Sequence, residues 1–142
     1  MRRDLVFQAI SIVVGLLTSL NASAQEEVSV LFSEQNPAVE FAVREICAGI
    51  EARGNSVSLR KLDAPAPTGN RTRIFLAASR QEAERLPGEL RLSSLDATKP
   101  QSYALRKQVS AERTTYAVLG ADAVAAMYGG LDLAEAIRLG TL

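Results

Sequence analysis

Five short segments of the chain have the apolar patterns of strands, either alternating or continuous. Residues 28–33 (VSVLFS) form a short run rich in β-branched and aromatic side chains, which is typical of a buried strand. Residues 72–79 contain the continuous apolar run IFLAA, the pattern of an interior strand covered on both faces. Residues 55–62 and 102–110 alternate apolar with polar positions, as strands with one wet face do. Residues 115–119 are apolar throughout, so we expect a hairpin in which they are more central than 102–110.

Two longer segments carry the start and stop signals of helices. The first begins at Asn36, which can cap it, and ends at Gly54, a residue free to adopt the left-handed conformation. Its apolar stripe has helical spacing and consists of Val39, Val43, Ile46 and Ile50. The second begins at the capping residue Asp122 and runs to about Leu139, where Gly140 closes it.

The order of these elements predicts the fold class. With a short helix expected at residues 81–86, the order is β-α-β-β-(short α)-β-β-α. The strand-helix-strand opening can form a parallel pair, whereas the closing hairpin is antiparallel. We therefore expect an α+β domain with a mixed sheet of about five strands and two main helices. Residues 90–101 are weakly patterned and are interpreted as a connection.

The first 24 residues have the features of a secretory signal peptide. A basic head at residues 2–3 precedes an apolar run over residues 5–20 and a small-x-small site at residues 22–24. We expect cleavage after Ala24, which leaves residues 25–142 as a single accessory domain in the periplasm or outside the cell, with no membrane attachment. A retained anchor is the less favoured alternative, because the run falls short of the ~20 residues that a spanning helix needs.

Composition excludes several function classes. The 16 basic and 16 acidic residues balance, so no basic excess points to a nucleic-acid partner. The chain has no histidine and one cysteine, Cys47, which removes the usual general base, the commonest metal ligand and Ser-His or Cys-His nucleophiles. We expect Cys47 to pack as a small apolar side chain. No cofactor, metal site or catalytic residue is expected in the chain.

The charged residues are interpreted as surface groups. Asp132 and Glu135 lie one helical turn apart, and Glu82, Glu84 and Glu89 cluster around the short helix, so a glycosidic pair of carboxylates can be considered. Acidic residues at this spacing more commonly form a solvated helix face. Seven basic residues near the predicted strands are interpreted as strand-face and loop charges that protect sheet edges: Arg60, Lys61, Arg71, Arg73, Arg106, Lys107 and Arg113.

Gly129-Gly130 inside the last predicted helix is the least expected local feature. Each glycine in a helix costs about 1 kcal/mol relative to alanine, so two in succession need a compensating reason. Our interpretation is that bare backbone lets another element approach closely, either the domain's own sheet or a following domain. A tolerated kink is the alternative. Tyr128, Gly129 and Gly130 are therefore the candidate residues for interdomain packing.

Three motifs near the end of the chain resemble a known domain. They are SYAL at residues 102–105, TYAVLGAD at 115–122 and MYGGLDLAE at 127–135. In this order they resemble the N-terminal domain that precedes the catalytic barrel of α-glucuronidases and β-N-acetylhexosaminidases, where a Tyr-x-Leu strand, a Gly-x-Asp junction and a Tyr-Gly helix motif recur. The chain departs from that pattern at residues 123–126 (AVAA), where relatives often carry charged or bulky polar side chains.

The resemblance implies a non-catalytic domain whose partner is the barrel. In that group the acid, base and sugar-binding residues lie in a following (β/α)₈ barrel, so no catalytic residue is carried over to this chain. Glycosidase activity is then expected only when the domain is joined to a barrel, and the chain is expected to be a fragment or truncated product of an exported carbohydrate-degrading enzyme. The alternative is a stand-alone module that binds a glycan or another protein. An enzyme in its own right is the third hypothesis.

Overall fold

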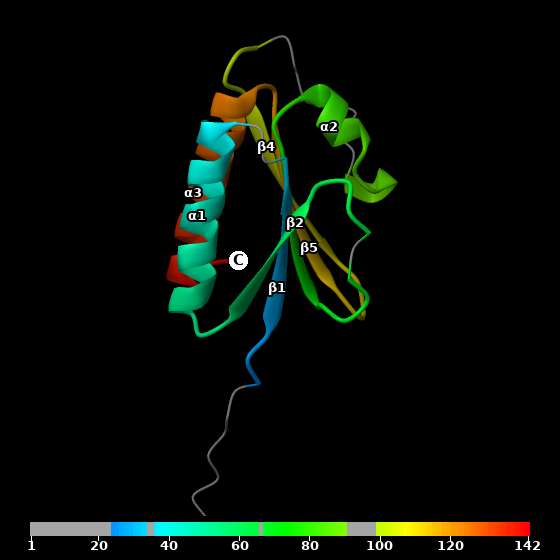
Figure 1. Ribbon diagram of the computed structural model, residues 1–142, viewed down its shortest axis with the longest axis vertical. Coiled ribbons are helices and arrows are strands. Elements are labelled where there is room, and N and C mark those ends of the chain that lie inside the picture. The colour runs from blue at the N-terminus through cyan, green and yellow to red at the C-terminus, as the bar shows by residue number, and fades with distance from the viewer. Residues whose placement is uncertain (1–23, 34–35, 66, 91–98) are drawn as a thin grey trace, which may run out of the picture.

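Two long helices, a sheet and a short helix form three successive layers in the computed structural model (Figure 1). The structure describes residues 24–33, 36–65, 67–90 and 99–142. The long helices lie on one face of the sheet, and the short helix and a 3₁₀ turn lie on the other. These elements are α1 (Pro37–Ala52), α3 (Ala123–Leu139), α2 (Arg80–Glu84) and η1 (Gly88–Leu90).

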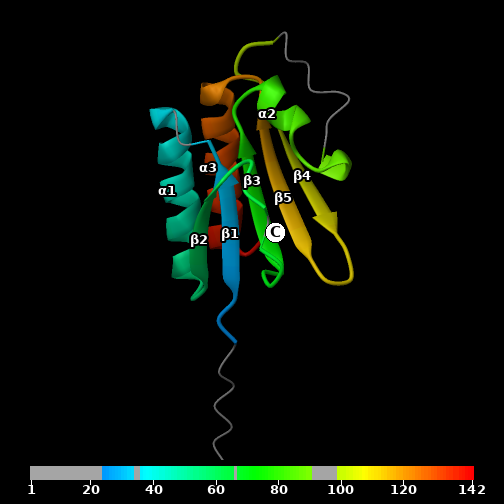
Figure 2. The same ribbon diagram turned by 45° about the vertical axis from the view of Figure 1, so that its right-hand side comes forward.

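The sheet is mixed, with four parallel strands and one antiparallel edge strand. Its strands are β1 (Glu27–Phe32), β2 (Ser56–Lys61), β3 (Thr72–Ala77), β4 (Tyr103–Val109) and β5 (Thr114–Gly120). They lie in the order β2-β1-β3-β5-β4, and β4 is antiparallel to β5. Figure 2 shows β4 and β5 at one side of the sheet and β1 and β2 at the other. The predicted α+β class, five-stranded sheet and element order are confirmed, including the central position of β5 in the hairpin.

Alternating positions of the strands form two separate cores. Val30, Ile74 and Val118 face α1 and α3, and all three are buried. Leu31 and Phe75, one position along, face α2 and η1. Because both faces of β1, β3 and β5 are covered at this level, these strands consist of the continuous apolar runs seen in the sequence.

The helix ends have the caps that the sequence predicts. The Asn36 side chain accepts a hydrogen bond from the Ala38 amide at 2.9 Å, and that of Asp122 accepts one from the Ala125 amide at 2.8 Å. Gly140 has a φ of 67°, the left-handed conformation that ends α3. The short helix α2 begins slightly before the predicted position, at Arg80.

Two sequence predictions concern residues that lie mainly outside the part of the chain that the structure describes. The predicted signal peptide occupies residues 1–24, of which the structure describes Ala24 alone, and residues 91–98 of the predicted connection are also outside it. Within the described part of the chain, no helix has the length and apolarity needed to cross a membrane.

Candidate functional site on helix α3 and strand β4

Gly129 and Gly130 face the interior of the domain. A Cβ atom built on Gly129 would lie 2.7 Å from both Tyr103 Cδ2 and Val118 Cγ1, and one on Gly130 would lie 2.7 Å from the Cβ of Ala42. These distances are shorter than carbon atoms tolerate, so the bare backbone is needed for α3 to lie against the sheet and α1. The domain's own elements therefore make the close approach, which is one of the two alternatives that the sequence left open.

Tyr128, the third predicted packing residue, points outward. Its side chain is 45% exposed. Successive residues of an α-helix turn by about 100°, so positions 128, 132, 135 and 139 share one stripe of α3. Asp132, Glu135 and Leu139 on this stripe are all exposed. A contact of this helix with a second domain would use this stripe rather than the glycines.

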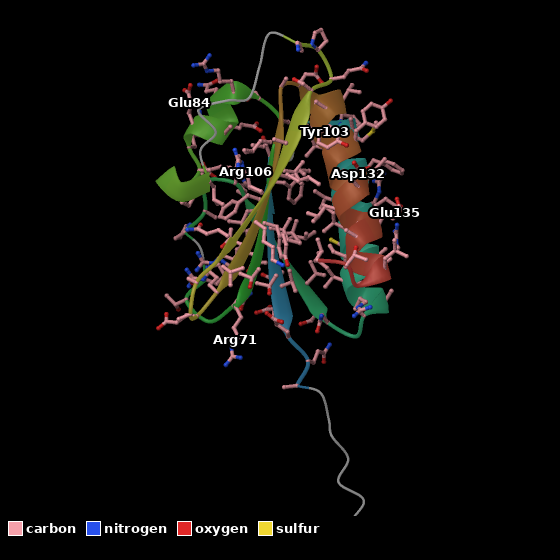
Figure 3. All side chains as sticks on the ribbon, turned by 180° about the vertical axis from the view of Figure 1, so that it is seen from behind. Arg71, Glu84, Tyr103, Arg106, Asp132 and Glu135 are labelled. Atoms are coloured by element: carbon pink, nitrogen blue, oxygen red, sulfur yellow. The ribbon has the colours of Figure 1, made fainter. Side chains whose placement is uncertain are left out.

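Tyr103 connects the edge strand β4 to the same stripe. Its ring lies against the bare backbone of Gly129, and its hydroxyl donates a hydrogen bond to the Asp132 carboxylate. Figure 3 shows the two side chains next to each other on the outer side of α3. This hydrogen bond is made by the neutral phenol, so it raises the pKa of Tyr103, with smaller contributions from burial and the charge of Asp132. Asp132 is therefore held in a surface contact between β4 and α3.

Large apolar side chains gather on β4, α3 and the residues after α3. We call this set the β4–α3 surface, and each of its side chains is more than a third exposed. It consists of Tyr103, Leu105, Val109, Val124, Tyr128, Leu139 and Leu142. A depression of about 270 Å³ between β4, β5 and the end of α3 is lined in part by Leu105, Tyr116, Leu133 and Leu142. The sequence pointed to Tyr128 but not to the apolar residues of β4. Alternation of apolar and polar residues predicts which side chains share a face of a strand, but not whether a helix covers that face.

The carboxylates considered for a glycosidic pair lie on the separate elements α2, η1 and α3, and Glu82 and Glu84 have partners on or next to α2. Glu82 accepts a hydrogen bond from the Ala78 amide at 2.7 Å while Ser79 Oγ accepts one from the Glu82 amide at 3.2 Å, a reciprocal cap of α2. Glu84 pairs with Arg80 at 3.0 Å on the surface of α2. Figure 3 shows Glu84 on the opposite side of the sheet from Asp132 and Glu135. The side chain of Glu89 lies outside the described part of the structure.

The described ranges contain no cluster of metal-ligating side chains, and their thiol is that of Cys47. Among these residues, no group of three or more His, Cys, Asp or Glu side chains could hold a metal ion. Cys47 is half-buried on α1 and packs against the core on the helix side of the sheet. Burial first, and then the charge of Glu51, raise the pKa of its thiol. The thiol therefore stays protonated at neutral pH, which disfavours a nucleophilic role.

The basic residues do not all lie where edge protection would need them. Arg60 is on β2 and Arg106 on β4, the two edge strands, and protection of edges is consistent with both. Arg73 is a strand-face charge as expected, but it is on β3, the middle strand of the sheet, so the interpretation that it protects an edge is wrong. The sequence could have shown on which face Arg73 lies. Side chains alternate along a strand, so Arg73 is on the face opposite to Ile74 and Leu76, away from the long helices.

Comparisons with known proteins add no relative. No protein-family model matches the chain, and no curated protein sequence matches it significantly.

Proposed function

We propose that the chain is a non-catalytic accessory domain that packs against a larger catalytic unit through the β4–α3 surface. The observation that carries the proposal is this surface, where apolar side chains of the edge strand β4 and of α3 stay exposed and the two elements meet where Tyr103 lies against Gly129. The motif resemblance suggests that the unit is the barrel of an exported carbohydrate-degrading enzyme, similar to an α-glucuronidase. The domain would brace the barrel while the barrel performs the hydrolysis.

The exposed apolar side chains of the β4–α3 surface come from two neighbouring elements, which suits a domain contact better than scattered single residues would. Single exposed apolar residues are common on proteins, but several of them on two neighbouring elements are typical of an interaction surface. Leu105 is 44% exposed and Val109 66% exposed, and they lie on the same face of β4 as Tyr103. As an edge strand, β4 also presents unpaired backbone groups that a neighbouring domain can cover.

Association with a barrel tests the proposal. The chain would be produced together with (β/α)₈ glycoside hydrolase barrels encoded beside or after its gene, and complex formation measured by size-exclusion chromatography with light scattering. We expect a one-to-one complex that Leu105→Asp and Val109→Asp abolish, because an interfacial carboxylate would lose its water. Both positions are exposed, so the variants should fold, which circular dichroism would check.

A matched control comes from the opposite edge of the sheet. Leu59 on β2 is 56% exposed, and Leu59→Asp should leave the complex intact. Equal losses for Leu59→Asp and Leu105→Asp would contradict the assigned surface. Glycosidase turnover by the chain alone would contradict the non-catalytic role itself.

The stand-alone binding module is the second candidate, and one observation favours it. A group of arginines with unpartnered nitrogens lies on the other face of the sheet, away from the β4–α3 surface.

A further inference from the structure

The sheet face opposite the long helices is apolar at one end and basic at the other. At the carboxyl ends of the parallel strands, α2 and η1 cover Leu31, Phe75 and Leu119. At the amino end of β3 this face carries Arg73, and Arg71 and Arg113 lie just before β3 and β5; we call these three residues the arginine corner. Figure 3 shows the Arg71 side chain at this end of the molecule, far from α2.

Strand register brings the three side chains to one place. Arg73 pairs with Thr115 of β5, and the Thr114 amide donates to the Arg71 carbonyl at 2.8 Å. Arg113 directly precedes Thr114, so it continues β5 beside Arg71. Arg73 is on the same face of β3 as Phe75, because side chains alternate along a strand. Arg71 and Arg113 lie just before the two strands and line one depression, and the charge of Arg113 acts on Arg73.

The arginine corner lacks neutralising partners in the described part of the chain. The Nε atoms of Arg73 and Arg113 are buried and have no hydrogen-bond partner. Arg73 donates from one terminal nitrogen to the Pro67 carbonyl at 2.9 Å, and the described residues form no ion pair with any of the three. A buried donor without an acceptor is unfavourable, because it has lost its hydrogen bonds to water. An anion bound beside these side chains would offset their positive charge.

The pKa of Arg73 agrees with the lack of negatively charged partners at the arginine corner. Burial, and then the nearby charge of Arg113, lower the pKa of Arg73. A depression of about 390 Å³ opens beside these groups and is lined by Arg71, Arg113, Ser110, Ala111, Glu112 and Thr114. Glu112 is the acidic side chain of this lining and is exposed. The lining therefore carries two positive side chains and one negative side chain, and Arg73 lies near Arg113.

We propose that the arginine corner binds the oxyanion group of a small ligand, a carboxylate or a phosphate, in the depression between Arg71 and Arg113. Guanidinium groups present planar forks of N–H donors that match the two oxygens of either group, and such charge-assisted bonds are about twice as strong as neutral ones. The lining of the depression contains none of the seven residues of the β4–α3 surface, so the proposal goes beyond the domain contact.

Titration of the ¹⁵N-labelled 142-residue chain tests the proposal. Inorganic phosphate and sodium glucuronate would be added separately at constant ionic strength, while NMR follows the Nε–Hε signals of the arginines. We expect saturable shifts of the Arg71 and Arg113 signals with at least one ligand, and the stronger ligand identifies phosphate or carboxylate as the preferred group. Absence of saturable shifts with both ligands overturns the proposal.

Variants separate a built site from general charge attraction. Arg71→Gln and Arg113→Gln should each weaken binding about tenfold, the equivalent of about 1.4 kcal/mol for a lost charge-assisted bond. Glu112→Gln should strengthen binding, because it removes from the lining a negative charge that repels the anion. Arg44→Gln is the control, since Arg44 is exposed on α1 and lies over the Phe41 ring. Equal weakening by Arg44→Gln and Arg113→Gln would overturn the proposal.

Discussion

Gly130 on α3 lies so close to Ala42 on α1 that a Cβ on the glycine would be 2.7 Å from the Ala42 Cβ. The two helices therefore meet through backbone on one side and a single methyl group on the other. Ala42 is fully buried, and short rigid groups at this contact cannot move aside. The size of the side chain at position 130 thus sets the spacing between α1 and α3.

Gly130→Ala should destabilise the domain although alanine is the better helix former. Overpacking costs about 1–3 kcal/mol, and the gain in helix propensity returns about 1 kcal/mol. We expect the free energy of unfolding in urea to fall by about 1 kcal/mol. Combining Gly130→Ala with Ala42→Gly should recover part of the steric loss, so the double-mutant cycle gives a favourable coupling. Gly69→Ala is the control, because nothing lies within 4 Å of a Cβ at that position. Higher stability for Gly130→Ala would show that the helices are not in close contact.

Asp132→Asn should lower the pKa of Tyr103. The carboxylate accepts the hydrogen bond of the phenol and so favours its protonated form, and an amide does so less strongly. NMR titration of the Tyr103 ring carbon between pH 8 and pH 12 measures the shift, and Glu135→Gln, one turn further along α3, is the matched control. The same titration curve in wild type and Asp132→Asn would contradict the contact between β4 and α3.

Asp122→Ala should destabilise the domain more at neutral than at acidic pH. Hydrogen bonds from the amides of Gln101, at 2.9 Å, and Ala125 lower the pKa of Asp122 below its ordinary value. Its contribution to stability is therefore present above the unfolded-state pKa of about 3.9 and is lost as the pH falls through the lower folded-state value. We expect the variant to lose about 1 kcal/mol at pH 7, the usual value of an N-cap. The difference in urea unfolding between wild type and variant should narrow toward pH 2.5. A constant difference from pH 7 to pH 2.5 would exclude a role for the ionised cap.

Cys47 should react slowly with alkylating reagents in the folded protein. Its raised pKa leaves less of the reactive thiolate at pH 8 than in the unfolded chain, and burial restricts access. Mass spectrometry would compare iodoacetamide modification in buffer and in urea, with slower modification expected in buffer. Glu51→Gln should raise the folded-state rate modestly, because it removes a negative charge that disfavours the thiolate. Equal rates in buffer and urea would place the thiol in solvent rather than against the core.

The elements were predictable because their signals are local. A cap such as Asn36, a terminator such as Gly140 and the apolar run of β3 act through neighbouring residues of the same segment, so the chain order and the α+β class follow from sequence. The need for close approach at Gly129 and Gly130 was also visible, since the cost of glycine in a helix is local. The resemblance of the closing motifs to a glycosidase accessory domain stays a prediction.

Which segments meet was decided by the tertiary structure alone. The sequence could not show that Ala42, rather than a following domain, occupies the space beside Gly130, nor that Arg71 and Arg113, far apart in the chain, lie beside each other. The order β2-β1-β3-β5-β4 places them there. Pairing of distant strands depends on how whole faces pack and on the entropy of the loops between them, and neither quantity is a property of a short stretch of residues.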